Sequence, residues 1–246
     1  MSAILTAEGL SLGYHGAPVV TDFNLTVEPG EIVTILGANG AGKTTTMLGL
    51  AGAIRPTAGS VTFDGEAGAS LLRNAKRGLG IVTDDRSIFR DLTARENLRL
   101  GRGSVDSAVD VFPALGPLLN RRAGLLSGGE QQMLGLARVI ASKPKIILTD
   151  ELSLGLAPII VTRLLAAIRA LADQGSAVVL VEQHVRLVLE IADKAVVLRR
   201  GAIEFIGSAA ELKDDDSRVA RAYLSSASEG ELHEGAPPTD PLPTTP

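Results

Sequence analysis

Short apolar stretches separated by glycine and proline turns run along most of this chain. Residues 4–12 and 23–27 alternate apolar with polar side chains, which is typical of strands that bury one face. A Pro-Gly turn at residues 29–30 then leads into residues 32–36, which are mostly apolar and favour a strand buried on both faces. The pattern predicts a small antiparallel β layer ahead of the main core.

Strand-like and helix-like segments alternate through the rest of the chain. The expected strands cover residues 61–63, 80–83, 146–148 and 177–181, and a hairpin of residues 195–198 and 202–206 turns at Gly201. The expected helices cover residues 44–53 and 158–172, with one more beginning near Glu130 and another opening at the capping box from Thr93 to Glu96. This βαβ order predicts an α/β fold with a mainly parallel sheet.

The periodicity weakens in two places. Between residues 101 and 124 it loosens around prolines and glycines, which predicts a short helical insertion within a helical subdomain of about residues 85–142. A charged helix is expected to end near Leu224, and the acidic, proline-rich residues 225–246 after it are expected to be disordered. The sequence therefore predicts one folded domain, residues 3–224, followed by a tail.

Charge and composition exclude several classes of protein. The 246 residues include no cysteine, which rules out disulfides and thiolate metal sites. The net charge is -4 and there is no basic block, so nucleic acid is not an expected partner. The chain shows no charged leader and no run of about 18 apolar residues. If it works at a membrane, we expect another polypeptide to hold it there.

The strongest chemical motif is Gly-x-x-x-x-Gly-Lys-Thr at residues 37–44, between the expected strand 32–36 and the helix after it. Glycines let the backbone form a nest whose N–H groups point at phosphate oxygens. Lys43 adds a charge for the β- and γ-phosphates of ATP, and the Thr44 hydroxyl is an expected Mg²⁺ ligand. The predicted ATP-binding residues here are Gly37, Ala38, Asn39, Gly40, Ala41, Gly42, Lys43, Thr44 and Thr45. A glycine-rich turn that carries a lysine by chance is the weaker alternative.

Two acids, Asp150 and Glu151, follow the expected strand 146–148. Ligands of α/β folds bind at the carboxyl ends of such strands. Asp150 is expected to hold Mg²⁺ through water, and Glu151 to polarise the attacking water as a general base. A solvated strand end would explain the acids equally well if they stood alone. Lys43 in the same chain favours the catalytic interpretation.

A second candidate anion site lies at Ser127, Gly128, Gly129 and Glu130. These residues open an expected helix, where free N–H groups and the positive end of the helix dipole attract anions. Ser127 and Glu130 also have the spacing of a capping box, and both interpretations can hold at once.

The order of these motifs resembles that of ATP-binding-cassette (ABC) ATPases over about residues 3–224. The resemblance implies a P-loop NTPase core with an N-terminal antiparallel β layer and a helical insertion. Segments 88–93, 129–133, 153–158 and 221–224 are similar to the second ATPase of bacterial branched-chain amino acid importers. Such a subunit is expected to use ATP and Mg²⁺ and to lie peripherally on the cytoplasmic face of the cell membrane. Its expected partners are ABC permease subunits, a second ABC ATPase subunit, and an extracytoplasmic solute-binding protein.

The resemblance also assigns roles to single residues. His184 matches the switch histidine that contacts the γ-phosphate, and it joins Glu151 and Lys43 as an expected catalytic residue. Tyr14 resembles the aromatic platform that stacks on adenine, although a purely structural tyrosine is a serious competitor. The signature Ser127 to Glu130 is expected to act in trans, completing the site of the other subunit.

Three positions depart from the family pattern. Asp84 stands where such ATPases carry Gln or Glu, and as a hard oxygen donor it is a candidate Mg²⁺ ligand. Leu152 replaces the usual Pro, and Ala157 stands where many cassettes have Asp. An importer ATPase for branched-chain amino acids or a related solute is favoured. A nucleotide-sensing subunit with weak or no hydrolysis, an ABC ATPase for a different solute, and a soluble ABC ATPase or simple kinase remain alternatives.

Overall fold

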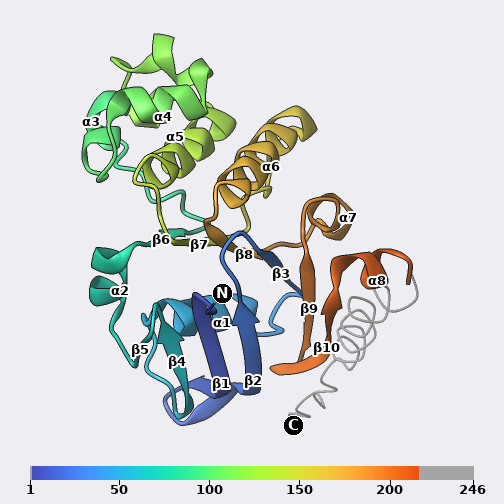
Figure 1. The fold of residues 1–246 in the computed structure, drawn as a ribbon. Helices are drawn as coiled ribbons and strands as arrows, with labels where there is room; N and C mark the ends of the chain where they lie inside the picture. Colours follow the sequence, from blue (N-terminus) through green and yellow to red (C-terminus); the bar gives the residue numbers. More distant parts are fainter. Residues whose placement is uncertain (1, 216–246) are drawn as a thin grey trace, which may run out of the picture.

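The computed structural model describes residues 2–215. The end of the predicted charged helix, the segment 221–224 and the predicted tail lie outside the described residues. Within them, two β-sheets and a separate helical lobe make up the molecule, as Figure 1 shows.

The smaller sheet is the predicted antiparallel layer. Its four strands have the order β2-β1-β4-β5, and every neighbouring pair is antiparallel. The bounds are β1 (Leu5–Tyr14), β2 (Ala17–Val27), β4 (Ala58–Phe63) and β5 (Glu66–Ala67). The layer thus also contains β4, which follows the phosphate-loop motif in the sequence.

The larger sheet has six strands in the order β10-β9-β3-β8-β7-β6. Its bounds are β3 (Ile32–Leu36), β6 (Leu79–Val82), β7 (Ile146–Asp150), β8 (Ala177–Val181), β9 (Lys194–Arg199) and β10 (Ala202–Ser208). The pairs β3–β8, β3–β9, β7–β8 and β6–β7 are parallel, and the edge hairpin β9–β10 is the only antiparallel pair among the described strands of this sheet. The predicted mainly parallel sheet is confirmed.

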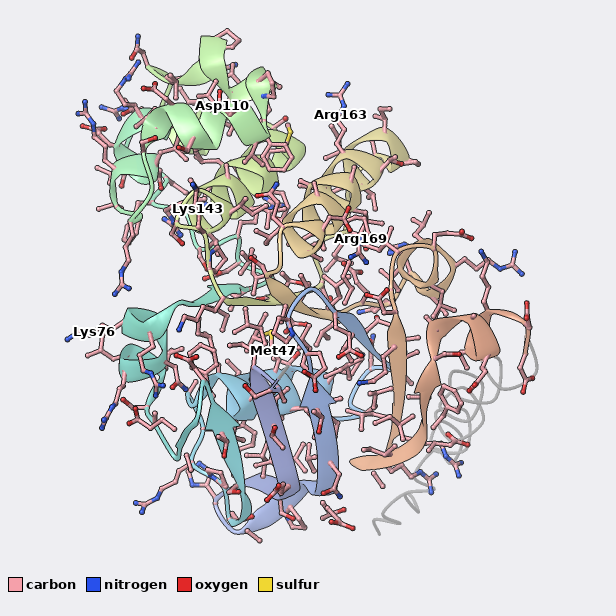
Figure 2. The ribbon with its side chains drawn as sticks, in the orientation of Figure 1. Met47, Lys76, Asp110, Lys143, Arg163 and Arg169 are labelled. Carbon is pink, nitrogen blue, oxygen red and sulfur yellow. The ribbon has the colours of Figure 1, made fainter. Side chains whose placement is uncertain are left out.

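Helices cover this sheet on both faces. Helix α1 (Lys43–Ala51) packs between the two sheets, where Met47 is fully buried (Figure 2). The other helices are α2 (Leu71–Arg77), α3 (Ala94–Arg99), α4 (Val105–Val111), α5 (Gly128–Ile140), α6 (Pro158–Asp173), α7 (Val185–Leu189) and α8 (Ala209–Lys213). Helices α3, α4 and the start of α5 form the lobe at the top of Figure 1, in the region predicted as the helical subdomain.

Two hydrophobic clusters hold these layers together. One fills the space between the sheets around α1, and the other lies on the opposite face of the larger sheet against α5 and α6. Strands β3, β7 and β8 are buried along their whole length because they face both clusters. The carboxyl ends of these three strands converge, and the predicted phosphate loop, Glu151 and Glu182 follow them directly.

Candidate functional site

The phosphate loop connects β3 to α1 and has the form that the glycine motif predicts. Gly37 approaches β9 so closely that a Cβ there would lie 2.3 Å from the Leu198 carbonyl oxygen. Gly42 is the N-cap of α1 with φ 100, a left-handed conformation that favours glycine. No side chain caps the first turn of α1. Its N–H groups therefore remain available to an anionic ligand such as a phosphate.

A cavity of about 510 Å³ opens over this loop. It is lined by Val19, Asn39, Gly40, Gly42, Lys43, Thr44, Thr45, Glu151, Leu154 and Gln183. The cavity thus joins the loop to the segments that follow β7 and β8, which places a phosphate-binding nest beside a carboxylate.

Lys43 is buried and already oriented within the loop. Its ammonium group donates hydrogen bonds to the carbonyl oxygens of Gly37, at 2.9 Å, and Ala38, at 3.1 Å. Burial lowers the pKa of Lys43 below its ordinary value, while the charges of Glu151 and Asp150 oppose that shift. A bound phosphate would add further negative charge beside this buried cation.

Asp150 meets the phosphate loop through Thr44. The Thr44 hydroxyl donates a 2.7 Å hydrogen bond to Asp150 Oδ2, while Asp150 Oδ1 is buried without a partner. Burial raises the pKa of Asp150, and the nearby charges of Glu151 and Asp84 raise it further. A divalent cation would stabilise this carboxylate, and two oxygen donors beside a phosphate site suit Mg²⁺. Residues 2–215 hold no group of three or more His, Asp or Glu side chains that could bind a metal without phosphate oxygens.

Glu151 has an unusual backbone conformation. Its φ is 48°, in the left-handed region that costs a non-glycine residue on the order of 1 kcal/mol or more. The Glu151 N–H donates a 2.9 Å hydrogen bond to the Val181 carbonyl, and its carboxylate accepts a hydrogen bond from the Gln183 amide. These contacts hold the Glu151 side chain in the cavity.

The structure does not bring His184 into this cavity. Its Nδ1 lies 2.7 Å from the Ser153 hydroxyl, and the ring is otherwise exposed. The neighbouring residue Gln183 lines the cavity instead. The chain bends at Gln183 soon after β8, and the two side chains have different partners: Gln183 contacts Glu151, and His184 contacts Ser153. The sequence analysis did not single out Gln183, which only the structure places in the cavity, and the catalytic role of His184 stays a prediction.

The signature segment lies elsewhere in the chain, at the start of α5. Ser127 is its N-cap, and the expected capping box with Glu130 is formed in both directions. A Cβ on Gly129 would lie 3.0 Å from Ile160 Cγ2, so this glycine also allows α5 to approach α6. The segment is not among the residues lining the phosphate cavity, although Ser127 is exposed.

Three further predicted positions lie around the cavity rather than in its wall. Tyr14 is 46% exposed at the end of β1, outside the lining residues. Asp84 accepts a 2.9 Å hydrogen bond from the Asp85 N–H, and its charge reaches Asp150. Leu152 is buried in the cluster against α5 and α6, where an apolar side chain is well suited. The roles of Tyr14 and Asp84 stay predictions.

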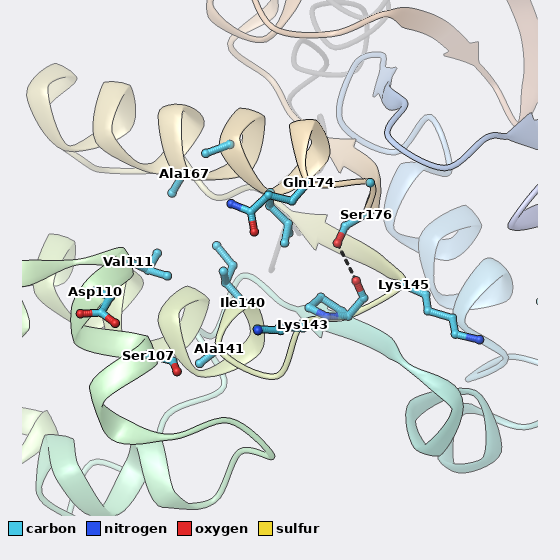
Figure 3. Close-up of a pocket in the computed structure, with 14 residues that line it drawn as sticks. Ser107, Asp110, Val111, Ile140, Ala141, Lys143, Lys145, Ala167, Gln174 and Ser176 are labelled. Atoms are coloured by element: carbon cyan, nitrogen blue, oxygen red, sulfur yellow. Dashed lines mark hydrogen bonds between the residues drawn. The ribbon is translucent and has the colours of Figure 1, made fainter.

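A larger cavity, about 660 Å³, lies beside the amino ends of β7 and β8, whereas the phosphate loop is at the carboxyl ends of the strands (Figure 3). It is bounded by α4, the end of α5 and the end of α6, and it contains Asp110, Lys143 and Gln174. It includes none of the residues of the predicted motifs. The smaller cavity over the phosphate loop is therefore the candidate nucleotide site.

Comparisons with known proteins agree with this geometry. Residues 20–153 match the ABC transporter family. The chain is 38% identical to the "High-affinity branched-chain amino acid transport ATP-binding protein BraG" of Pseudomonas aeruginosa, covering 90% of this chain and 99% of that protein. It is 36% identical to the "Lipopolysaccharide export system ATP-binding protein LptB" of Haemophilus influenzae, covering 90% and 97%. A solved dimer of the ATP-binding cassette MJ0796 with ADP and Pi has a TM-score of 0.74 at 24% identity, covering 83% and 98%.

None of the helices within residues 2–215 combines the length and apolar character that a membrane crossing requires. The family match, the relatives and the phosphate loop agree on one assignment. The chain belongs to the ABC transporter family, as an ATP-binding subunit with an ATPase fold.

Proposed function

We propose that this chain hydrolyses ATP to drive an importer for branched-chain amino acids or a related small polar solute. The observation that carries the proposal is the similarity to the branched-chain amino acid transport protein BraG, which extends over 99% of that protein. The segments 88–93 and 153–158 support the same subgroup.

The cavity provides the groups that hydrolysis needs. The loop N–H groups and Lys43 bind the β- and γ-phosphates, and Glu151 polarises the attacking water. Gln183 holds the Glu151 carboxylate and offers an amide to the γ-phosphate. Thr44 and Asp150, with Asp84 nearby, would hold Mg²⁺, which neutralises charge on the phosphates when it is bound. Catalysis is then mainly positioning and charge stabilisation.

A second ATPase subunit completes the site in trans. Ser127, at the N-terminus of α5, is exposed and is not among the residues that line the cavity of its own chain, which leaves it accessible to a second subunit. A partner's Ser127 to Glu130 would close over the γ-phosphate held by Lys43. A cassette of similar fold was solved as a dimer with ADP and Pi, which supports the pairing of two subunits.

The same proposal places the subunit at the cytoplasmic face of the membrane. Permease subunits would convert the closing and opening of the ATPase pair into transport, and an extracytoplasmic solute-binding protein would deliver the solute. A lipopolysaccharide exporter is the second candidate, because the LptB relative is nearly as similar to this chain.

Uptake measurements separate the two candidates. Deletion of this chain from its native cell should lower uptake of radiolabelled leucine, isoleucine or valine. The intact chain should restore uptake, whereas the Lys43→Ala variant should not. Normal uptake of all three amino acids in the deletion strain, together with a defect in lipopolysaccharide export, would favour the exporter.

A further inference from the structure

Glu182 is a buried acid with no role in the chemistry described above. It follows β8 directly and is 1% exposed. Its Oε1 accepts a 3.0 Å hydrogen bond from the Ser153 N–H, and its Oε2 accepts a 2.6 Å hydrogen bond from the Ser153 hydroxyl. The backbone N–H of Gln183 also donates to this carboxylate. A buried carboxylate that makes three such bonds is bound firmly to the segment that follows β7.

These bonds belong to a set of links between two short segments. Residues 151–153 follow β7, and residues 181–184 end β8 and follow it. The Glu151 N–H binds the Val181 carbonyl, the Gln183 amide binds the Glu151 carboxylate, and Ser153 binds Glu182. Glu182 therefore fixes one end of a clamp whose other end holds Glu151 in the phosphate cavity.

The clamp also constrains the His184 ring. A serine hydroxyl has one proton, and here that proton is donated to Glu182, so Ser153 Oγ can only accept from His184 Nδ1. The neutral imidazole must then carry its proton on Nδ1 and leave Nε2 bare. Neutral imidazole in water favours the opposite form, with the proton on Nε2, so the state of the ring reports on the clamp.

We propose that Glu182 is a positioning residue for hydrolysis, which as a carboxylate holds Ser153, orients the segment bearing Glu151, and selects the Nδ1–H form of His184. This inference rests on the proposed function, because it requires Glu151 to act on the attacking water. Glu182 is not among the residues that line the cavity. Its effect is on the placement of Glu151 and Gln183.

The alternative to this proposal is that Glu182 is protonated, which would reverse the directions of its hydrogen bonds. Burial raises the pKa of Glu182, while its hydrogen bonds from Ser153 and Gln183 oppose that shift. A protonated Glu182 would donate to Ser153 Oγ, and the hydroxyl would turn and donate to His184 Nδ1. The neutral ring would then carry its proton on Nε2. The two states of Glu182 thus give opposite forms of His184.

Glu182→Gln tests the proposal in the full-length chain. Gln keeps the size of Glu, but its amide N–H₂ would face one of the two Ser153 donors. The Ser153 hydroxyl would then have to accept a hydrogen bond from the amide or lose its partner. Ser153→Ala removes one oxygen, and it keeps the test decisive if Glu182→Gln fails to fold. Glu190→Gln is the matched control, because Glu190 is exposed and pairs only with Lys213 among the described contacts.

We expect Glu182→Gln and Ser153→Ala each to lower kcat for ATP hydrolysis by roughly 10- to 100-fold, with KM nearly unchanged. The double variant should be no worse than the slower single variant, because both changes break one unit. In ¹⁵N spectra of the intact chain, which has three histidines, His184 should be in the Nδ1–H form at alkaline pH and should leave it in Glu182→Gln.

Two results would overturn the inference. One is wild-type kcat in both variants. The other is an Nε2–H form of His184 in the intact chain, which would show that Glu182 is not the carboxylate that the clamp requires. The parallel variant Glu151→Gln separates this failure from that of the proposed function. If Glu151→Gln remains fully active, the hydrolytic assignment fails, whereas an inactive Glu151→Gln beside fully active Glu182→Gln and Ser153→Ala variants refutes only the clamp.

Discussion

The side-chain amide of Gln183 donates a hydrogen bond to the carboxylate of Glu151, and both residues line the cavity over the phosphate loop. The two residues come from the ends of adjacent parallel strands, β7 and β8. Gln183 can therefore hold the proposed general base and, from the same position, donate to a γ-phosphate when ATP is bound. An amide does this without changing its charge with pH.

Gln183→Ala should lower kcat roughly 10- to 100-fold, because Glu151 loses its only described side-chain partner and the γ-phosphate loses a donor. His184→Ala should cause a much smaller loss, since the ring lies outside the cavity. Steady-state ATPase kinetics on both variants make the comparison. A larger loss in His184→Ala than in Gln183→Ala would restore the histidine to the role that the sequence suggested.

Glu151→Gln should reduce hydrolysis at least about 100-fold while ATP still binds, because the amide cannot accept the proton of the attacking water. Binding of a fluorescent ATP analogue and single-turnover hydrolysis measure the two properties separately. Lys43→Ala is the contrasting variant, since it should lose binding as well. Hydrolysis that persists in Glu151→Gln would remove this residue from the mechanism.

Gly135→Ala should destabilise the chain by about 1–3 kcal/mol even though alanine is the better helix former. A Cβ at this position of α5 would lie 2.5 Å from the Arg86 carbonyl oxygen, in the loop that carries Asp84. Gly116→Ala is the control, because its Cβ would meet only Val109 at an ordinary 3.6 Å. Urea unfolding of both variants checks the prediction. Equal stability would show that the loop moves aside freely.

Asp64→Asn should lower stability at neutral pH by at most about 1 kcal/mol, and less at high salt. Asp64 lies 2.7 Å from the Lys145 ammonium and also contacts Arg77, and the hydrogen bond from Lys145 lowers the pKa of Asp64. Because the folded-state pKa is the lower one, the stabilisation is present above the unfolded value of 3.8 and is lost as pH falls through the folded value.

Asp22→Asn is the matched control for the pH series. Asp22 shares the backbone φ of 50° with Asp64 and has no described ion pair, and asparagine tolerates that conformation at both sites. The stability difference between Asp64→Asn and the intact chain should shrink towards acid pH in thermal unfolding experiments, whereas Asp22→Asn should differ little throughout. A difference for Asp64→Asn that grows on acidification would contradict the ion-pair account.

Local signals in the sequence account for much of this fold. The capping boxes at Thr93 and Ser127 both form, because each needs only residues within one helical turn. The apolar run at residues 177–181 is a strand with those bounds. Helices α2 and α7 were not predicted, since they are short and lack a clear apolar period.

The site was predictable where a motif fixes the backbone, and less so where tertiary contacts decide. The glycines of residues 37–42 predict the phosphate loop, and the acids at the end of β7 predict the facing carboxylates. Which of two neighbouring residues enters the cavity depends on how Glu182 and Ser153 pair across segments 29 residues apart. No periodicity in the sequence reports such a contact, so Gln183 and the clamp emerged only from the structure.

The central claim is that Lys43 of one subunit and Ser127 of another act on the same ATP, and a mixing experiment tests it most directly. Lys43→Ala and Ser127→Arg variants should each be inactive. Mixed and allowed to exchange partners, they should regain hydrolysis, because a mixed pair contains one site with both an intact phosphate loop and an intact signature. If the intact chain alone hydrolyses ATP and the mixture stays as inactive as its components, the two segments do not meet across a dimer and the account is wrong.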